Sequence, residues 1–257
     1  MSSAGLVERG GASVNWFSPE ELTEMSRPTM DRAIEAIEAN DLERAAALCA
    51  EMRSEWRGLH DTLVGMIAGL ASHIQARLGE DALEDAWMDS LDRMWRTESS
   101  RVAAADRKRV VRGLAATWRA HSGSGGGANP GSFTIEEDGE KFTFKMNPCG
   151  SGQRLWRNGA YEGEHPLTKT ERSHTWTFGR ANFPVYCTHC AFMNDILPIR
   201  WYGVPLFPAD VPDDFDADPC TWYWYKDPGD IPERFWERYK MSSYRQGRRV
   251  DPGGATP

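Results

Sequence analysis

The sequence predicts an α+β protein, in which an N-terminal helical bundle is followed by a loop-rich mixed α/β domain with a β-hairpin and a cysteine-rich metal site. Apolar residues recur every three or four positions between residues 18 and 121, which is typical of amphipathic helices. A glycine-rich stretch then interrupts the pattern. Beyond it, apolar and polar residues alternate on both sides of an Asp-Gly pair, which indicates a hairpin, and four of the five cysteines follow.

The first elements are a flexible lead-in over 1–17 and a short helix that begins at Ser18. Ser18 is a favourable N-cap residue, Pro19 suits the first helical position, and Glu21 completes a capping box. These three residues predict where the helical bundle begins.

Further helices continue the bundle to residue 121. An Ala-Asn-Asp sequence at 39–41 can separate two of them. Cys49 lies on the apolar face of the second, and we expect it to be buried in the core, as free cysteines commonly are. The expected helices cover residues near 30–38, 42–56, 59–74, 79–96 and 101–121.

A change of composition at 122–132 predicts a flexible linker, and a cysteine-rich α+β domain is expected over 133–245. The hairpin turns at Asp138-Gly139. Short segments rich in aromatic and β-branched residues predict further strands, a short helix is expected near Cys187, a C-terminal helix over 231–243, and a disordered tail over 246–257. The strand-like segments are TWTFG, FPVYC, IRWYG and CTWYWYKDP.

Charge and composition limit the functional classes. The formal net charge of −8 argues against binding to nucleic acid or to anionic lipid. No secretion signal and no run of 18 apolar residues stands in the sequence, so we expect no membrane span and a cytoplasmic protein. An odd number of cysteines, five, fits a reducing compartment in which structural disulfides are rare.

The cysteines of the second part predict a metal site. Cys187 and Cys190 form a CxxC pair, and such a turn places two sulfur atoms within reach of one ion. Cys149 and Cys220 each follow a proline in a turn and can complete a tetrahedron. Zinc and iron–sulfur clusters both accept four thiolates. Zinc is the first choice, because a loop-rich domain with little regular structure gains much stability from a structural ion, and the cluster is the alternative.

The sequence around Cys149 adds one local resemblance. Residues 147–152, Asn-Pro-Cys-Gly-Ser-Gly, resemble part of the SEC-C zinc motif. That motif has a cysteine where this chain has Asn147, and a closing Cys-Cys or Cys-His pair that this chain lacks. The resemblance covers fewer than ten residues and implies that the turn can present a thiolate to zinc.

Two other interpretations of the cysteines stay open. The CxxC could be a redox-active dithiol, although no βαβ pattern surrounds it, or it could have no special role. A histidine could also replace one cysteine ligand. His189 lies inside the CxxC, and His174 lies nearby in the sequence.

Basic and aromatic residues follow each predicted ligand, so convergence of the cysteines would also gather a pocket for a small anionic or aromatic molecule. The expected anion-binding residues are Arg154, Arg157, Arg200 and Lys226. The expected catalytic residues are His189, His174, Tyr202 and Tyr225.

These residues favour a metal-dependent enzyme of lyase or hydrolase type with an unidentified reaction. The alternative is a non-catalytic, zinc-stabilised binding module for a protein partner or a small ligand. The expected partners are a small molecule and a second copy of the chain, bound through the helical part.

Overall fold

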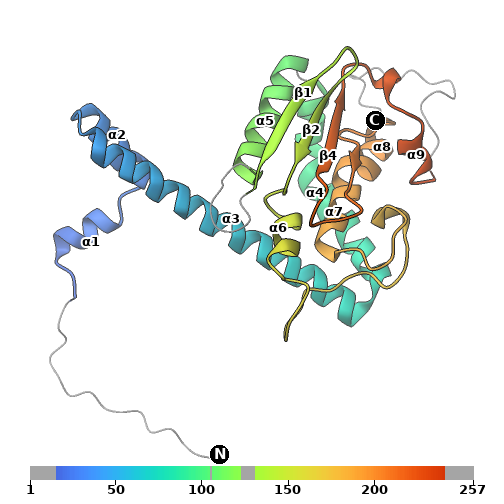
Figure 1. Ribbon diagram of the computed structural model, residues 1–257, viewed down its shortest axis with the longest axis horizontal. Helices are drawn as coiled ribbons and strands as arrows, with labels where there is room; N and C mark the ends of the chain where they lie inside the picture. The colour runs from blue at the N-terminus through green and yellow to red at the C-terminus, as the bar shows by residue number, and fades with distance from the viewer. Residues whose placement is uncertain (1–15, 105, 123–130, 241–257) are drawn as a thin grey trace, which may run out of the picture. The chain divides into compact units, whose positions relative to one another are not determined.

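The computed structural model describes residues 16–104, 106–122 and 131–240 (Figure 1). Most of the expected lead-in and linker, and the whole of the expected tail, lie outside these ranges. The chain divides into two compact units, Met1–Trp56 and Arg57–Pro257. The division falls within one continuous helix, α3 (Leu42–Leu78), rather than in the glycine-rich stretch. The α+β class is confirmed, with helix predominating over a small antiparallel sheet.

The first unit contains α1 (Pro19–Met25), α2 (Thr29–Glu38) and the beginning of α3. The predicted capping box is present, because the Glu21 amide donates to Ser18 Oγ at 3.1 Å and the Ser18 amide donates to Glu21 Oε2 at 2.7 Å. Four small or aliphatic residues form the buried core of this unit. They are Ala33, Ala36, Ala45 and Leu48. Cys49 is exposed, so its expected burial is wrong, because the packed face of α3 passes through Ala45 and Leu48.

The second unit begins with the rest of α3 and continues through α4 (Glu80–Ala104) and α5 (Arg107–Ser122). No break separates the helices expected over 42–56 and 59–74, since α3 runs through both. Gly79 follows α3 with a φ of +91°, which a glycine adopts without strain.

A four-stranded antiparallel sheet follows, in the order β1-β2-β4-β3. The predicted hairpin is confirmed as β1 (Phe133–Glu137) paired with β2 (Lys141–Met146). Asp138 Oδ1 holds the turn by accepting from the amides of Glu140 and Lys141, both at 2.8 Å. The predicted strand at CTWYWYKDP is β4 (Cys220–Tyr225), which pairs with β2 and with β3 (Ala209–Asp210).

The other three strand-like segments are helical, so those predictions are wrong. The segment TWTFG contains the 3-10 helix η1 (Thr175–Thr177). The remaining two belong to one helical run, made of η2 (Val185–Thr188), α7 (His189–Ala191), the π-helical turn η3 (Phe192–Ile196) and α8 (Leu197–Tyr202). Their aromatic and β-branched residues lie in the core, where packing overrides strand propensity.

Three short helices complete the described fold. They are α6 (Gly152–Arg157), η4 (Pro228–Asp230) and α9 (Arg234–Glu237). The expected helix over 231–243 is therefore shorter, and residues beyond 240 lie outside the described part. No helix in the described ranges has a stretch long and apolar enough to cross a membrane.

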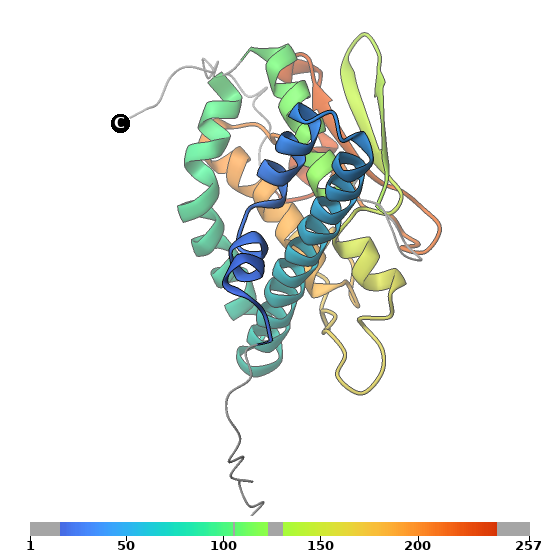
Figure 2. The same ribbon diagram turned by 90° about the vertical axis from the view of Figure 1, so that its left-hand side faces the viewer.

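Residues of the helical region and of the cysteine-rich region share their cores. Leu83 and Leu91 of α4 pack with Phe192 of the helical run and Phe235 of α9. Trp118 of α5 packs against Trp222 of β4, so α5 lies along the sheet (Figures 1 and 2).

Tryptophan N–H groups reinforce these contacts. Trp87 of α4 donates to Thr188 Oγ1 at 2.9 Å. In the opposite direction, Trp176 donates to Glu84 and Trp201 donates to Asp92, each at 2.8 Å. A tryptophan can bury a large apolar surface and still donate one hydrogen bond, which accounts for several of the eleven tryptophans in the sequence.

Candidate functional site

The structure brings the four predicted metal ligands into one region of the second unit. Cys149 lies in the turn between β2 and α6, and Cys220 begins β4. Cys149, Cys190 and Cys220 belong to or pack against the cluster that contains Trp118. Cys187, from η2, is buried, and its Sγ lies beside Gly152, three residues after Cys149. Three segments distant in sequence therefore meet at their cysteines.

The turn that carries Cys149 directs backbone donors at its sulfur. The Gln153 amide donates to Cys149 Sγ at 3.3 Å. The Gln153 side chain accepts from the Cys149 amide at 2.9 Å and donates to the Asp218 carbonyl at 2.8 Å, just before Cys220. Gln153 is buried, so it fixes two of the cysteine-bearing segments against each other.

Two glycines permit the close approach of neighbouring segments. A Cβ at Gly152 would lie 2.4 Å from Cys187 Sγ. A Cβ at Gly150 would lie 1.7 Å from the His121 carbonyl oxygen at the end of α5. Both distances are shorter than any van der Waals contact allows, so a side chain at either position requires the backbone or its neighbour to move.

The ionisation of the four thiols is coupled. Burial raises the pKa of Cys149, Cys187, Cys190 and Cys220, since a thiolate loses its hydration there. Every pair of the four is close enough for one thiolate to raise the pKa of another thiol. Backbone amides of Gln153, Ser151 and Gly152 act in the opposite direction on Cys149.

The indole N–H of Trp222 also faces this cluster. Burial dominates the raised pKa of Cys220, and the nearby Trp222 N–H acts in the opposite direction. Within the described residues, the buried Trp222 Nε1 atom has no hydrogen-bond partner. A negative charge on Cys220 would therefore satisfy a buried donor.

The four sulfur atoms lie near one another but are not arranged around a common point. Among the described residues, no three cysteine, histidine, aspartate or glutamate side chains surround one point as metal ligands. His189 lies at the cluster, with its Nε2 at 3.5 Å from Cys190 Sγ and its Nδ1 bonded to the Tyr186 carbonyl. His174 lies elsewhere, with its Nε2 at 2.6 Å from Glu80 Oε2.

A buried polar network supports the Cys149 turn from the helices. Ser151 Oγ lies 2.6 Å from His121 Nε2 and 3.4 Å from His60 Nε2. His121 Nδ1 lies 2.8 Å from Ser122 Oγ, which accepts from the Gly150 amide at 2.9 Å. Burial lowers the pKa of His121 to about 3, with His60 and His189 contributing, so this imidazole is neutral. Residues 60, 121 and 151 are too far apart in sequence for any spacing to predict this network.

The predicted anion-binding residues are spread over the unit. Arg154 makes a bidentate pair with Asp61 at 2.8 and 3.0 Å. Arg157 donates to the Phe215 carbonyl at 2.9 Å and to Asn147 Oδ1 at 2.7 Å. Lys226 pairs with Glu137 at 2.8 Å, and Arg200 is exposed.

The predicted catalytic tyrosines also have separate surroundings. Tyr202 Oη lies 2.9 Å from Ser99 Oγ and donates to the Arg96 carbonyl at 3.2 Å. Tyr225 is half-buried on β4 beside Tyr223, on the strand that pairs with β2. Of the expected catalytic residues, His189 is the one whose side chain contacts a cysteine.

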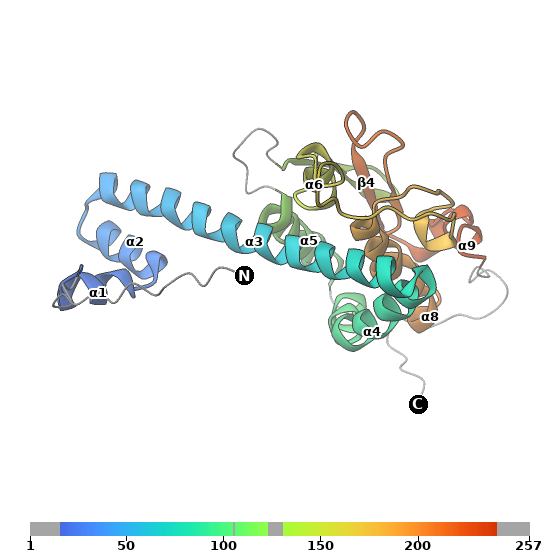
Figure 3. The same cartoon turned by 90° about the horizontal axis from the view of Figure 1, so that it is seen from below.

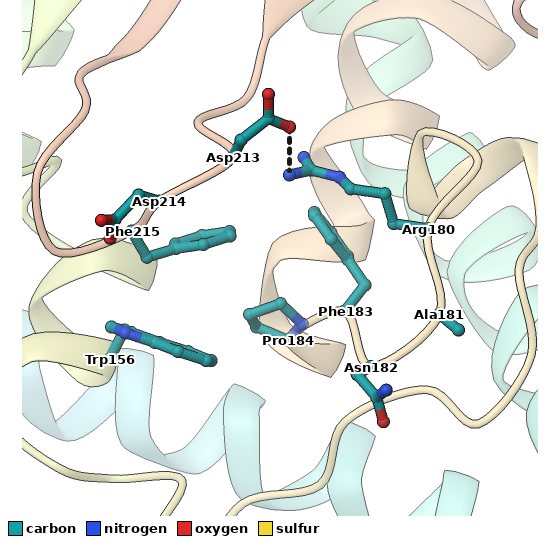
Figure 4. A pocket seen from close by; sticks show the side chains of 9 residues that line it. All are labelled: Trp156, Arg180, Ala181, Asn182, Phe183, Pro184, Asp213, Asp214 and Phe215. Atoms are coloured by element: carbon teal, nitrogen blue, oxygen red, sulfur yellow. Dashed lines mark hydrogen bonds and ion pairs between the residues drawn. The ribbon is translucent and has the colours of Figure 1, made fainter.

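A pocket of about 250 Å³ opens between the loop before η2 and the loop before β4. Figure 4 shows Trp156 and Phe215 on one side and Phe183 and Pro184 on the other, with Arg180 above them. Arg180 donates to the Pro212 carbonyl at 2.7 Å and pairs with the exposed Asp213 at 3.3 Å. Burial lowers the pKa of Arg180, although Asp213 opposes this effect. None of these residues was among the predicted site residues, although Trp156 and Phe183 stand close to predicted ligands in sequence.

A scan of protein-family models, a search of curated proteins and a search of solved structures each find no match to this chain.

Proposed function

We propose that the protein is a non-catalytic binding module whose second unit is held by a zinc ion on Cys149, Cys187, Cys190 and Cys220. The observation that carries the proposal is the meeting of these four cysteines from three separate segments, with Gly152 leaving room for the Cys187 sulfur. Four thiolates around one ion are a common structural zinc site.

The surrounding donors support thiolates at this place. The amides around Gln153 direct N–H groups at Cys149, and the buried Trp222 N–H near Cys220 has no hydrogen-bond partner among the described residues. Such outer donors stabilise the negative charge that metal-bound sulfur retains. A divalent cation would also offset the cost of burying four thiolates that repel one another.

Zinc is favoured over an iron–sulfur cluster because the second unit has a small sheet and many short helices. A loop-rich fold gains much from one ion that joins three segments. A cluster bound by the same four thiolates is the alternative.

A non-catalytic role is favoured over the lyase or hydrolase chemistry expected from the sequence. Such chemistry needs an acid or base beside the ion and beside a substrate. The contacts of His174 with Glu80 and of Tyr202 with Ser99 hold those side chains in separate places. His189 lies near the cysteines, where its contact with Cys190 suits a side chain that hydrogen-bonds to a metal ligand rather than one that acts on a substrate.

The test is the metal content and absorption spectrum of anaerobically purified full-length protein, together with Cys187→Ser and Cys49→Ser. We expect one zinc per chain, no visible absorption band, and loss of zinc in Cys187→Ser only. Cys49 is the matched control because it is an exposed cysteine of the first unit. Iron and sulfide with absorption near 400 nm would assign a cluster instead. A chain without metal whose Cys187→Ser variant is as stable as wild type would refute the metal site.

The pocket beside Arg180 supports a second candidate function, the binding of a small aromatic anion. The partly desolvated Arg180 guanidinium lines the pocket and can bind a carboxylate in place of the exposed Asp213, and the aromatic walls suit a ring. Titration with benzoate, followed by tryptophan fluorescence, tests this function. We expect saturable quenching that Arg180→Lys weakens and that Arg93→Lys, an exposed surface control on α4, leaves unchanged. Equal quenching in all three proteins would refute it.

A further inference from the structure

The part of α3 that belongs to the second unit has two apolar faces, of which one is covered. Val64, Ala68 and Ala71 are buried in the cores of this unit. Another set of large aliphatic side chains on the same helix is exposed. Its members are Leu59 (58% exposed), Leu63 (49%), Met66 (58%), Ile67 (42%) and Leu70 (61%). We call these five residues the α3 patch.

The α3 patch is one continuous stripe. At 3.6 residues per turn, its five residues fall within an arc of about 100°, which is as wide as the face that a surface helix ordinarily buries. Leu59, Leu63, Met66 and Leu70 follow one another at intervals of four, three and four, the spacing of a helix-pairing seam. Figures 1 and 3 show α3 running along the outside of the second unit.

The segment that holds four of the five residues of the α3 patch carries no charge, and the nearest carboxylate, Asp61, is paired with Arg154. From Thr62 to Ala76 the chain has no aspartate, glutamate, lysine or arginine, although this segment is helical and partly exposed. Two copies of this face can therefore meet without like-charge repulsion. A helix that lies on an anionic membrane would instead carry lysines and arginines along its polar face.

The exposed area suits a dimer. Half-exposed aliphatic side chains of this size leave about 80 Å² each in water, so the α3 patch leaves on the order of 400 Å². A stable interface buries about 800 Å² per partner, of which somewhat more than half is apolar. The α3 patch thus supplies about the apolar core that one side of a two-fold symmetric interface needs.

We propose that the protein is a homodimer in which the α3 patches of two copies pack against each other about a two-fold axis. The interface does not involve the cysteines, and the α3 patch lies on the face of α3 that the second unit's core leaves uncovered. The dimer proposal is therefore independent of the metal proposal.

The test is sedimentation velocity and light scattering of the full chain over a wide range of concentrations. We expect wild type at twice the chain mass and Leu63→Asp at the chain mass, with unchanged far-ultraviolet circular dichroism because Leu63 is already half exposed. Leu70→Asp is the second variant and should behave in the same way. Met94→Asp is the matched control, since Met94 is 62% exposed on α4 and outside the α3 patch, and it should remain dimeric.

Two outcomes would overturn the proposal. One is a wild-type chain that is monomeric at every concentration. The other is a dimer that Leu63→Asp and Leu70→Asp leave intact. Flotation with phosphatidylcholine–phosphatidylserine vesicles separates the membrane alternative, and co-flotation of a monomeric wild type that Leu63→Asp abolishes would assign the α3 patch to lipid instead.

Discussion

Glu80 and His174 form a hydrogen-bonded pair between the start of α4 and the segment before η1, with 2.6 Å between Glu80 Oε2 and His174 Nε2. The Glu80 carboxylate is 5% exposed and also accepts from Arg172 Nε at 3.2 Å and from the amide of Glu171. One carboxylate thus fixes the loop over 171–174 to a helix that begins far away in sequence.

Glu80→Gln is expected to lower the free energy of unfolding by about 2 kcal/mol at pH 7, because it weakens several charge-assisted hydrogen bonds at a buried site. Burial acts to raise the pKa of Glu80, but the bonds from His174, Glu171 and Arg172 outweigh it and lower the pKa. The stabilisation is therefore present above the ordinary glutamate value of 4.5 and is lost as the pH falls below it. Urea unfolding at pH 7 and pH 4 measures both effects.

Asp81→Asn is the control for Glu80→Gln, because Asp81 is a neighbouring carboxylate whose side chain is 86% exposed and pairs with Arg172 at 2.7 Å. A surface pair of this kind contributes less than about 1 kcal/mol. Equal effects of the two substitutions would contradict the structural role of Glu80.

Asp210→Asn is expected to loosen α9. Asp210 accepts from Arg234 at 2.8 and 2.7 Å and from Arg238 at 2.9 Å, and its pKa is about 2 because these bonds outweigh burial. Since its side chain is 35% exposed, solvent screening limits the loss to about 1 kcal/mol at pH 7. The difference from wild type should disappear as the pH falls from 4 towards 2, and should shrink in high salt, in thermal unfolding scans. A constant difference across that range would contradict the ion pairing.

We predict that Asp195 lowers the free energy of unfolding at neutral pH. It is 1% exposed on the π-helical turn, its Oδ2 accepts from Tyr239 Oη at 2.6 Å, and burial raises its pKa to about 7. The folded state therefore holds a proton that the unfolded state has released, and stability falls by up to about 1.4 kcal/mol per pH unit between pH 4 and 7.

Asp195→Asn should consequently be at least as stable as wild type at pH 8 and should remove this part of the pH dependence. Melting temperatures at pH 5 and pH 8 provide the measurement. Tyr239→Phe is the companion variant, and it should destabilise because it leaves the buried carboxyl without its donor. A wild-type protein whose stability increases between pH 5 and pH 7 would contradict the prediction that Asp195 is protonated in the folded state.

Gly152→Ala is expected to reduce stability by about 2 kcal/mol, because its Cβ would lie 2.4 Å from Cys187 Sγ and force the two segments apart. If the metal proposal holds, the same variant also loses zinc on mild chelation sooner than wild type does. Gly139→Ala is the matched control, since a Cβ there meets nothing within 4 Å. Chemical unfolding and a chromogenic zinc assay measure the two effects, and a wild-type result for Gly152→Ala would show that the cysteine segments lie further apart.

The sequence predicted those parts of the fold that depend on local physics. Ser18 and Glu21 identify a capped helix, and the alternation around Asp138-Gly139 identifies the hairpin of β1 and β2. The prediction of strands at TWTFG, FPVYC and IRWYG was wrong. The large side chains of Trp176, Val185 and Ile199 are buried in a core that they share with α4, and no local sequence pattern reveals such a tertiary contact.

The candidate site also has a part that the sequence predicts and a part that it does not. The CxxC spacing and the two Pro-Cys turns were enough to group Cys149, Cys187, Cys190 and Cys220, which the structure places together. The expected gathering of Arg154 and Lys226 around them does not occur, because Asp61 and Glu137 pair with these cations elsewhere. Partners that lie about ninety residues apart are set by tertiary packing, and sequence spacing carries no information about them.

The hydrogen-bonded chain from His60 through Ser151 and His121 to Ser122 and the Gly150 amide ties the Cys149 turn to α3 and α5. The turn around Cys149 therefore has these supports only when α3 and α5 are both packed against it. A fragment that begins at residue 133 would contain all four cysteines but lack these supports. Such a fragment should therefore hold the Cys149 turn less firmly than the full chain does, and if the metal proposal holds it should also bind zinc more weakly.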